Sequence, residues 1–360
     1  MKTLASKLLF AATVLAAAFG VTLALAFAST GAQAAGFQHS FAADPKGKPL
    51  EIGIWYPSEA PVRPVTMGPT TMSVAMNGAV NGPVNGPAQG KALPLVVMSH
   101  GNGGSFLGHY DTAIALADAG FVVAAVTHTG DNYKDQSRAT DVMDRPRQIS
   151  RVIDHMLSSW DDRTAIDGSR IGMFGFSSGG FTTLASIGGV PDFSTIGPVC
   201  RQYPGDFACQ LIAKSGTASG SASSSGDVTA SPTSAIARAA DARIKAAVVA
   251  APALGFTFAP DGLKNVKVPV QLWRAEDDAV LPHPRYAEVV RLALPDAPDY
   301  RVVPNAGHYD FLVPCSSALA SIAPTICTSA AGFDRAAFHA SFNAAVVGFF
   351  SKTLGVGSST

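Results

Sequence analysis

The residues best placed to do chemistry form a Gly-x-Ser-x-Gly motif, Gly175-Phe-Ser177-Ser-Gly179. An apolar run at residues 170–174 leads into this motif, and a helix-compatible segment at 179–187 follows it. A sharp turn from strand to helix holds such a serine in a strained conformation with its hydroxyl exposed, and the flanking glycines leave room for the turn. The motif and its context therefore predict that Ser177 is a nucleophile.

A serine hydroxyl is a weak nucleophile until a base removes its proton. The histidines that follow Ser177 in the chain are His283, His308 and His339. His308 comes directly after the last predicted strand, and catalytic groups gather at the carboxyl ends of strands in open α/β sheets. His283 begins a predicted helix and His339 lies inside one. We therefore predict that His308 is the base and that the other two are surface or packing residues.

The base needs a carboxylate behind it to fix its tautomer and to stabilise the imidazolium that forms. Asp277 and Asp278 follow the predicted strand at 268–273, where a carboxylate can reach a histidine after the next strand. Both residues qualify. The register of the apolar residues that follow, 280–282, favours Asp278 as the acid.

Acyl transfer also needs donors for a developing oxyanion. We expect one to be the backbone N–H of Ser178, the residue after the nucleophile, and the other to be the main-chain amide of Asn102 in a glycine-rich loop after an earlier strand. His100 is expected to buttress that loop. His128 and Asp131 follow the next strand, and with His100 they are candidates for the pocket wall, although their turn-rich surroundings equally suit a plain loop.

Apolar runs of strand length alternate with helix-length segments along most of the chain. The runs lie at 93–98, 121–126, 170–174, 244–250, 268–273 and 300–303. The helix-like segments lie at 111–119, 145–157, 179–187, 284–293 and 336–354. Strands that are apolar on both faces belong in a parallel sheet covered by helices, whereas residues 50–56 alternate as an antiparallel strand does. We therefore predict one doubly wound, mostly parallel α/β domain over 35–360, with antiparallel strands at its N-terminal end.

Two segments interrupt this alternation. Residues 67–90 contain Asn-Gly three times together with prolines, which predicts a flexible loop insertion. Residues 200–236 combine two cysteines with a long run of Ser, Ala, Gly and Thr, which buries too little apolar surface to fold by itself. This second insertion is either a lid over the site or a disordered surface loop.

The N-terminus has the features of an export signal. Lys2 and Lys7 precede an apolar run at 8–28, and Ala-Gln-Ala at 32–34 offers a cleavage site. We predict a signal peptide at 1–34 and a secreted or periplasmic protein with no stable membrane insertion after cleavage. The alternative is an uncleaved anchor, because an apolar run of about 20 residues is long enough to span a bilayer.

The four cysteines fall into two local pairs. We predict disulfides between Cys200 and Cys209 and between Cys315 and Cys327, since each would close a short loop in an oxidising compartment. Buried free thiols are the alternative. Neither pair has the close spacing of a zinc site, so no metal site is predicted.

Composition narrows the class of partner. The 26 basic and 26 acidic residues give zero net charge, which argues against a nucleic-acid binder. Only 14% of residues are charged, and 47% are hydrophobic. A chain of low charge density suits uncharged or apolar small-molecule substrates.

Taken together, the motifs resemble the predicted dienelactone hydrolases related to bacterial platelet-activating-factor acetylhydrolases, within the α/β-hydrolase superfamily. The matching pieces are Glu51-Ile-Gly-Ile-Trp-Tyr-Pro57, Ser99-His-Gly101, Val126-Thr-His-Thr-Gly130-Asp131-Asn132, Arg145-Pro-Arg-Gln-Ile-Ser150, the Gly-x-Ser-x-Gly motif and Gly307-His308. The resemblance implies an α/β-hydrolase fold and hydrolysis of a small carboxylic ester through an acyl-serine, with no metal or organic cofactor. Two alternatives stay open: a peptidase or amidase with the same three residues, and a non-catalytic binding protein on a hydrolase scaffold.

Overall fold

In a computed structural model of the chain, the described residues are 34–80, 92–218, 239–356. Within them the strands form a 10-stranded sheet. The strands are β1 (Ala34–Ala42), β2 (Leu50–Ser58), β3 (Arg63–Met67), β4 (Thr70–Met76), β5 (Leu93–Ser99), β6 (Val122–Thr127), β7 (Ile166–Phe176), β8 (Ile244–Ala250), β9 (Val270–Ala275) and β10 (Asp299–Val303). The signal-peptide prediction concerns residues that, apart from the first residue of β1, lie outside this description.

The sheet is parallel on one side and mainly antiparallel on the other. Its strand order is β10-β9-β8-β7-β5-β6-β2-β1-β4-β3. All neighbours from β10 to β6 are parallel, whereas β2 runs antiparallel to both β6 and β1. The prediction of a doubly wound, mostly parallel sheet with antiparallel N-terminal strands is confirmed.

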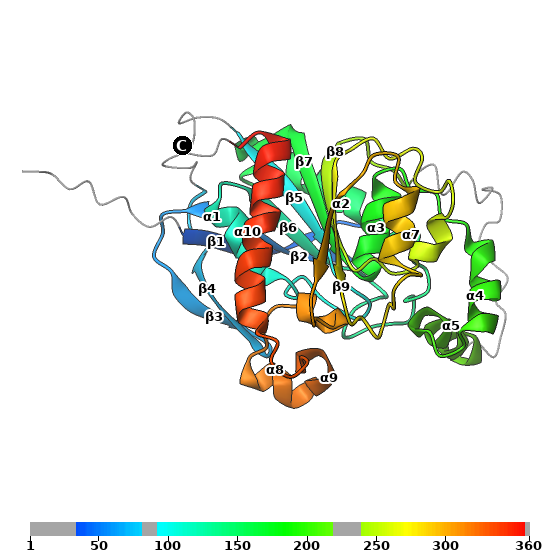
Figure 1. The fold of residues 1–360 in the computed structure, drawn as a ribbon. Coiled ribbons are helices and arrows are strands. Elements are labelled where there is room, and N and C mark those ends of the chain that lie inside the picture. Colours follow the sequence, from blue (N-terminus) through cyan, green and yellow to red (C-terminus); the bar gives the residue numbers. More distant parts are fainter. Residues whose placement is uncertain (1–33, 81–91, 219–238, 357–360) are drawn as a thin grey trace, which may run out of the picture. The chain divides into compact units, whose positions relative to one another are not determined.

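Helices cover both faces of the sheet (Figure 1). They are α1 (Tyr110–Asp118), α2 (Asp144–Ser158), α3 (Ser178–Ser186), α4 (Ile196–Gln202), α5 (Phe207–Ala218), α7 (Ala287–Ala293), α8 (Ser317–Ile322), α9 (Pro324–Cys327) and α10 (Arg335–Leu354). Short 3-10 turns are η1 (Arg163–Ala165), η2 (Phe193–Thr195), η3 (Gly255–Phe258) and η4 (His308–Phe311).

Two apolar clusters fill the space between the helices and the sheet. One gathers the inward faces of α2, α3 and α7, including Ile149, Leu184 and Val290. The other gathers those of α1 and α10, including Leu116 and Phe350. All five side chains are fully buried, so the central strands are covered on both faces, as their apolar sequence predicts.

The first interrupting segment contains more structure than its composition suggested. Within 67–90, β4 pairs in parallel with β1 and antiparallel with β3. Along β4 the buried Met72 and Val74 alternate with the exposed Thr71 and Ser73. This two-residue period is typical of a strand, and the Asn-Gly repeats farther along, in 81–91, lie outside the described residues.

The second interrupting segment begins with helices rather than loop. α4 and α5 occupy its described part, and the Ser-rich residues 219–238 lie outside the description. On α5, Ala208 and Cys209 are buried, and Ala208 belongs to the apolar cluster that includes Ile149 and Leu184. The two cysteine pairs are joined as predicted, Cys200 to Cys209 and Cys315 to Cys327.

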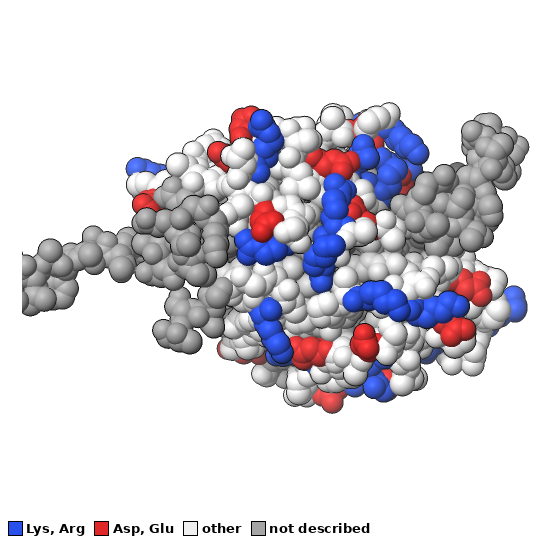
Figure 2. Space-filling model, turned by 90° about the horizontal axis from the view of Figure 1, so that it is seen from above, with Lys and Arg blue, Asp and Glu red and all other residues white. Residues whose placement is uncertain are grey.

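The surface carries no large area of one charge on the side seen in Figure 2. Acidic and basic side chains alternate there, separated by wide uncharged regions. This distribution agrees with the zero formal charge of the whole chain. Among the described helices, none combines the length and the apolar character needed to cross a bilayer.

Candidate active site

Ser177 occupies the turn between β7 and α3 in a conformation that few side-chain-bearing residues adopt. Its φ is 55° and its ψ is −117°. Two glycines make the turn sterically feasible, because a Cβ at Gly175 would overlap the carbonyl of Gly179, and a Cβ at Gly179 would overlap the carbonyl of Ser99. The Ser177 N–H donates to the carbonyl of Ala250 at 2.9 Å, which fixes the turn against β8.

The Ser177 turn lies at the point in the sheet where the chain, after adding β6 on one side of β5, adds β7 on the other side. β5 pairs with β6 on one side and with β7 on the other, so the loops after β5 and β7 leave the sheet next to each other. Such a reversal point is where ligands bind in open α/β sheets. The close approach of the α3 N-terminus to the end of β5 follows from this topology.

His308 and Asp278 converge on Ser177 from the carboxyl ends of two other strands. Nε2 of His308, in η4 after β10, lies 3.0 Å from the Ser177 Oγ. Its Nδ1 lies 2.8 Å from Oδ2 of Asp278, in the loop after β9. All three residues are at least 90% buried. With the Asp278 carboxylate accepting a hydrogen bond from Nδ1–H of His308, the other ring nitrogen, Nε2, carries no proton and faces the Ser177 hydroxyl.

Asp278 and Asp277 differ in their surroundings although they are adjacent. Asp278 Oδ1 accepts the backbone N–H groups of Val280 at 3.0 Å and Leu281 at 2.7 Å, which leaves Oδ2 for His308. Asp277 is exposed, and its own N–H donates to Ala306 O. Of the two carboxylates that the sequence left open, the structure places Asp278 against the histidine.

The turn that carries His308 is tied to α10 by buried polar contacts that the sequence did not suggest. Asp310 accepts the Gly307 N–H at 2.7 Å with one oxygen, and the Arg335 Nε–H at 3.0 Å with the other. His339 donates from Nε2 to the Asp310 carbonyl at 2.9 Å and also contacts Asp111. His339 was expected to be a surface or packing residue, and it is a buried link between α10, α1 and η4.

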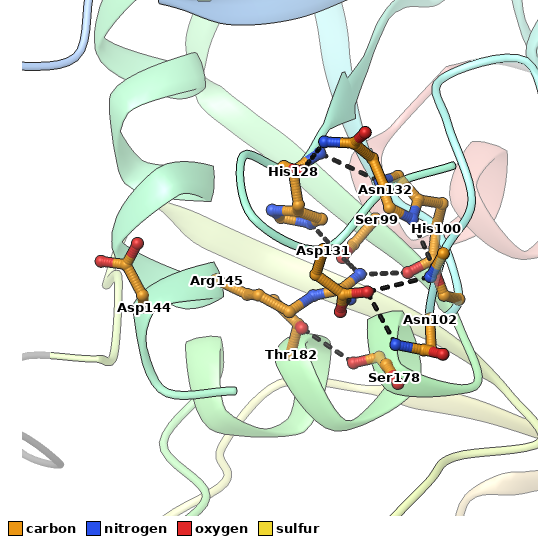
Figure 3. A network of polar contacts seen from close by, with 12 residues as sticks. Ser99, His100, Asn102, His128, Asp131, Asn132, Asp144, Arg145, Ser178 and Thr182 are labelled. Atoms are coloured by element: carbon orange, nitrogen blue, oxygen red, sulfur yellow. Dashed lines mark hydrogen bonds and ion pairs between the residues drawn. The ribbon is translucent and has the colours of Figure 1, made fainter. Parts of the chain in front are cut away.

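The two predicted oxyanion donors are Ser178, the first residue of α3, and Asn102, in the loop after β5. In the described chain, the main-chain amides of Asn102 and Ser178 donate to no protein acceptor. Asp131 holds the Asn102 loop, since its Oδ1 accepts the Asn102 side-chain amide at 2.7 Å and the Gly103 N–H at 2.9 Å (Figure 3). One side-chain N–H of Asn102 is thereby engaged by Asp131, and its backbone amide remains the candidate donor for an oxyanion.

Arg145 of α2 lies beneath this loop and completes the network of Figure 3. Its guanidinium pairs with the second carboxylate oxygen of Asp131 and donates to the His100 carbonyl. Both members of the ion pair are almost fully buried, with side-chain exposures of 3% and 4%. Removing one member of such a buried ion pair strongly destabilises the folded protein, because the other charge is left buried without a partner. The pair joins the loop after β6, which carries Asp131, to α2.

His100 and His128 support the loop as neutral rings. Burial lowers the pKa of both well below 6.5. His100 Nδ1–H donates to the Gly101 carbonyl, and its Nε2 accepts the His128 N–H at 3.0 Å. His128 Nδ1–H donates to Gln148 Oε1 at 2.9 Å. His128 Nε2 lies 2.8 Å from the Ser99 Oγ, so both ring nitrogens of each histidine have a hydrogen-bond partner within the protein.

The sequence left His100, His128 and Asp131 open as pocket-wall or plain-loop residues. All three lie beside the Asn102 loop and are at most 4% exposed. His100 contacts this loop, as expected of a buttress. Among the described residues, no group of three or more His, Cys, Asp or Glu is arranged to hold a metal ion.

One family model matches part of the chain. It is described as platelet-activating factor acetylhydrolase, isoform II, and matches residues 65–148. The matched segment runs from β3 through the Asn102 loop to Arg145 of α2, and ends before Ser177. No curated protein matches the chain significantly.

Among solved structures, a ferulic acid esterase from Streptomyces cinnamoneus superposes with a TM-score of 0.56. It is 20% identical in sequence, and the match covers 92% of this chain and 93% of that one. The chain therefore has the α/β-hydrolase fold. The family-model match and the structural match are both to esterase-type hydrolases.

Proposed function

We propose that the chain is a secreted serine hydrolase that cleaves carboxylic esters through an acyl-serine intermediate. One observation carries the proposal: His308 bridges Asp278 and Ser177, with contacts of 2.8 Å and 3.0 Å from its two ring nitrogens. In the first step, Ser177 Oγ attacks the ester carbonyl carbon and His308 Nε2 takes the serine proton. Asp278 stabilises the imidazolium that results.

The negative charge that develops on the carbonyl oxygen then needs fixed donors. The backbone amides of Ser178 and Asn102 are proposed to supply them, helped by the positive end of α3. Collapse of the tetrahedral intermediate breaks the bond to the alcohol, which leaves with the proton from His308. Water then attacks the acyl-serine, His308 accepts its proton, and the carboxylic acid departs as Ser177 is regenerated.

Export is proposed from two features of the chain. The signal-like N-terminus precedes the folded domain. Both cysteine pairs are at disulfide geometry, and disulfides persist in oxidising compartments such as the periplasm or the extracellular medium.

Paired substrates test the reaction class. We expect the protein to hydrolyse 4-nitrophenyl acetate and to leave alanine 4-nitroanilide almost untouched, because an amine is a worse leaving group than an alcohol. Ser177→Ala abolishes the ester turnover, whereas Ser341→Ala, on the exposed face of α10, retains it. Efficient cleavage of the anilide with no ester turnover would favour a peptidase.

A further inference from the structure

A largely apolar pocket opens beside the turn that carries Ser177. Its volume is about 350 Å³, and Ser178, the proposed oxyanion donor, is one of its lining residues. The inner wall comes from α3 and the loop after β8, the outer wall from α4 and α5, and residues 139–143, which precede α2, line the pocket as well. Lining residues that carry the argument are Ser178, Phe181, Ala253, Ile196, Leu211 and Ile212.

The outer wall of this pocket is anchored rather than loosely attached. The Asp206 side chain, fully buried between α4 and α5, accepts the Tyr286 hydroxyl and pairs with Arg285 at 3.3 Å. The Arg285 guanidinium lies 3.8 Å from the centre of the Tyr203 ring. Together with the Cys200 to Cys209 link, these contacts join the α4–α5 wall to the segment that precedes α7.

The chemistry of the lining selects an uncharged occupant. Among the described residues that line the pocket, Asp141 is the only charged one, and its carboxylate already pairs with Arg138. A negatively charged group would therefore find no free cation among these described lining residues. Aliphatic and aromatic side chains dominate the rest of the lining, and such surfaces bind hydrocarbon.

Two neighbouring groups decide which half of an ester faces the pocket. His308 protonates the leaving alcohol in the proposed reaction, so the alcohol lies next to His308, which is not among the lining residues. Ser178 holds the carbonyl oxygen and does line the pocket. The part of the substrate directed into the pocket is therefore the acyl chain.

We propose that this pocket binds an aliphatic acyl chain longer than acetyl, and that the α4–α5 wall sets the preferred chain length. The inference rests on the proposed function, because it assigns the two halves of the ester from the roles of Ser178 and His308. Each methylene transferred from water into the pocket favours binding roughly fourfold. A hexanoyl ester is thus expected to be a substantially better substrate than an acetyl ester.

The test compares 4-nitrophenyl hexanoate with 4-nitrophenyl acetate. In the wild-type protein, kcat/KM for the hexanoate is expected to exceed that for the acetate about tenfold or more. Leu211→Trp, which fills the pocket from α5, lowers this ratio by about tenfold. Gln210→Trp places the same side chain on the exposed face of α5, outside the lining, and keeps the wild-type ratio. Equal ratios in the Leu211→Trp variant and the wild type would overturn the assignment.

A binding measurement separates the pocket from the chemistry. Titration calorimetry on Ser177→Ala is expected to show tighter binding of the hexanoate than of the acetate, and Leu211→Trp in the same background removes the difference. If the wild type hydrolyses neither ester but this binding pattern holds, the proposed reaction fails and the pocket assignment stands. Equal binding of the two esters to Ser177→Ala contradicts the pocket assignment whatever the turnover.

Discussion

At the scale of single residues, two adjacent carboxylates have different environments. Asp278 is buried and receives two backbone N–H groups besides the His308 ring, whereas Asp277 faces solvent. The backbone donors hold one oxygen of Asp278 and orient the other toward the imidazole. The local turn, and not acidity alone, therefore makes Asp278 the candidate acid.

Substitution of each carboxylate tests this difference. Asp278→Asn is expected to lower kcat for 4-nitrophenyl acetate about 10³- to 10⁴-fold, because an amide donating to His308 favours the wrong tautomer. Asp277→Asn keeps about the wild-type rate. Circular dichroism checks that both variants fold. The reverse order of effects, with Asp277→Asn the inactive variant, would exchange the two roles.

The candidate nucleophile, base and acid could be located from the sequence because each follows a recognisable strand in an expected order. The residues that hold these three side chains in position could not be found in the same way. Arg335 contacts Asp310 across 25 positions, and His339 contacts Asp111 across 228. Such pairs carry no local pattern, so only the fold reveals them. Arg145 and Asp131 were both visible as parts of family motifs, but their pairing was not, and Asp131 was left open between a pocket wall and a plain loop.

At the scale of elements, the loop after β5 depends on a neighbouring helix for its position. Asp131 joins the Asn102 loop to Arg145 of α2 with both carboxylate oxygens. A loop that presents a backbone amide to an oxyanion needs this kind of support, since a small displacement weakens the hydrogen bond. We regard Asp131 and Arg145 as positioning residues.

This support predicts a defect in turnover that is separable from stability. Asp131→Asn is expected to lower kcat for 4-nitrophenyl acetate about 10²-fold and to destabilise the fold by about 3–5 kcal/mol, because Arg145 is left buried and unpaired. The double variant Asp131→Asn/Arg145→Met regains stability in urea unfolding but not turnover.

The matched control for this prediction is Asp135→Asn, which removes a charge from an exposed position four residues along the same loop. It is expected to retain both activity and stability. Wild-type kcat in the double variant would show that the loop does not need Asp131 to present the Asn102 amide.

The strongly apolar central strands and the main helices were predictable to within a few residues. β8, for example, spans the predicted residues 244–250, because both of its faces are covered. β4 was missed because it directly precedes the Asn-Gly repeats, and α4 and α5 were missed because they precede a Ser-rich run. In both places the average composition of a long stretch of sequence concealed a short segment of regular structure.

At the scale of the whole molecule, the strand order brings the separate motifs together. Order β7-β5-β6 places the loops after β5 and β7 side by side, and β8, β9 and β10 follow in parallel. Alternating apolar segments predicted a parallel sheet but not the order of its strands, because pairing between distant strands depends on tertiary packing. The convergence of residues 177, 278 and 308 was thus inferred from chain order and is seen only in the folded molecule.

Covalent labelling of the folded protein with a fluorophosphonate, followed by peptide mass spectrometry, tests most directly whether His308 activates Ser177. We predict one label per chain, on the peptide that contains Ser177, and much slower labelling in His308→Ala. A folded protein that takes no label, or takes it at another serine, would contradict the claim that His308 activates the Ser177 hydroxyl.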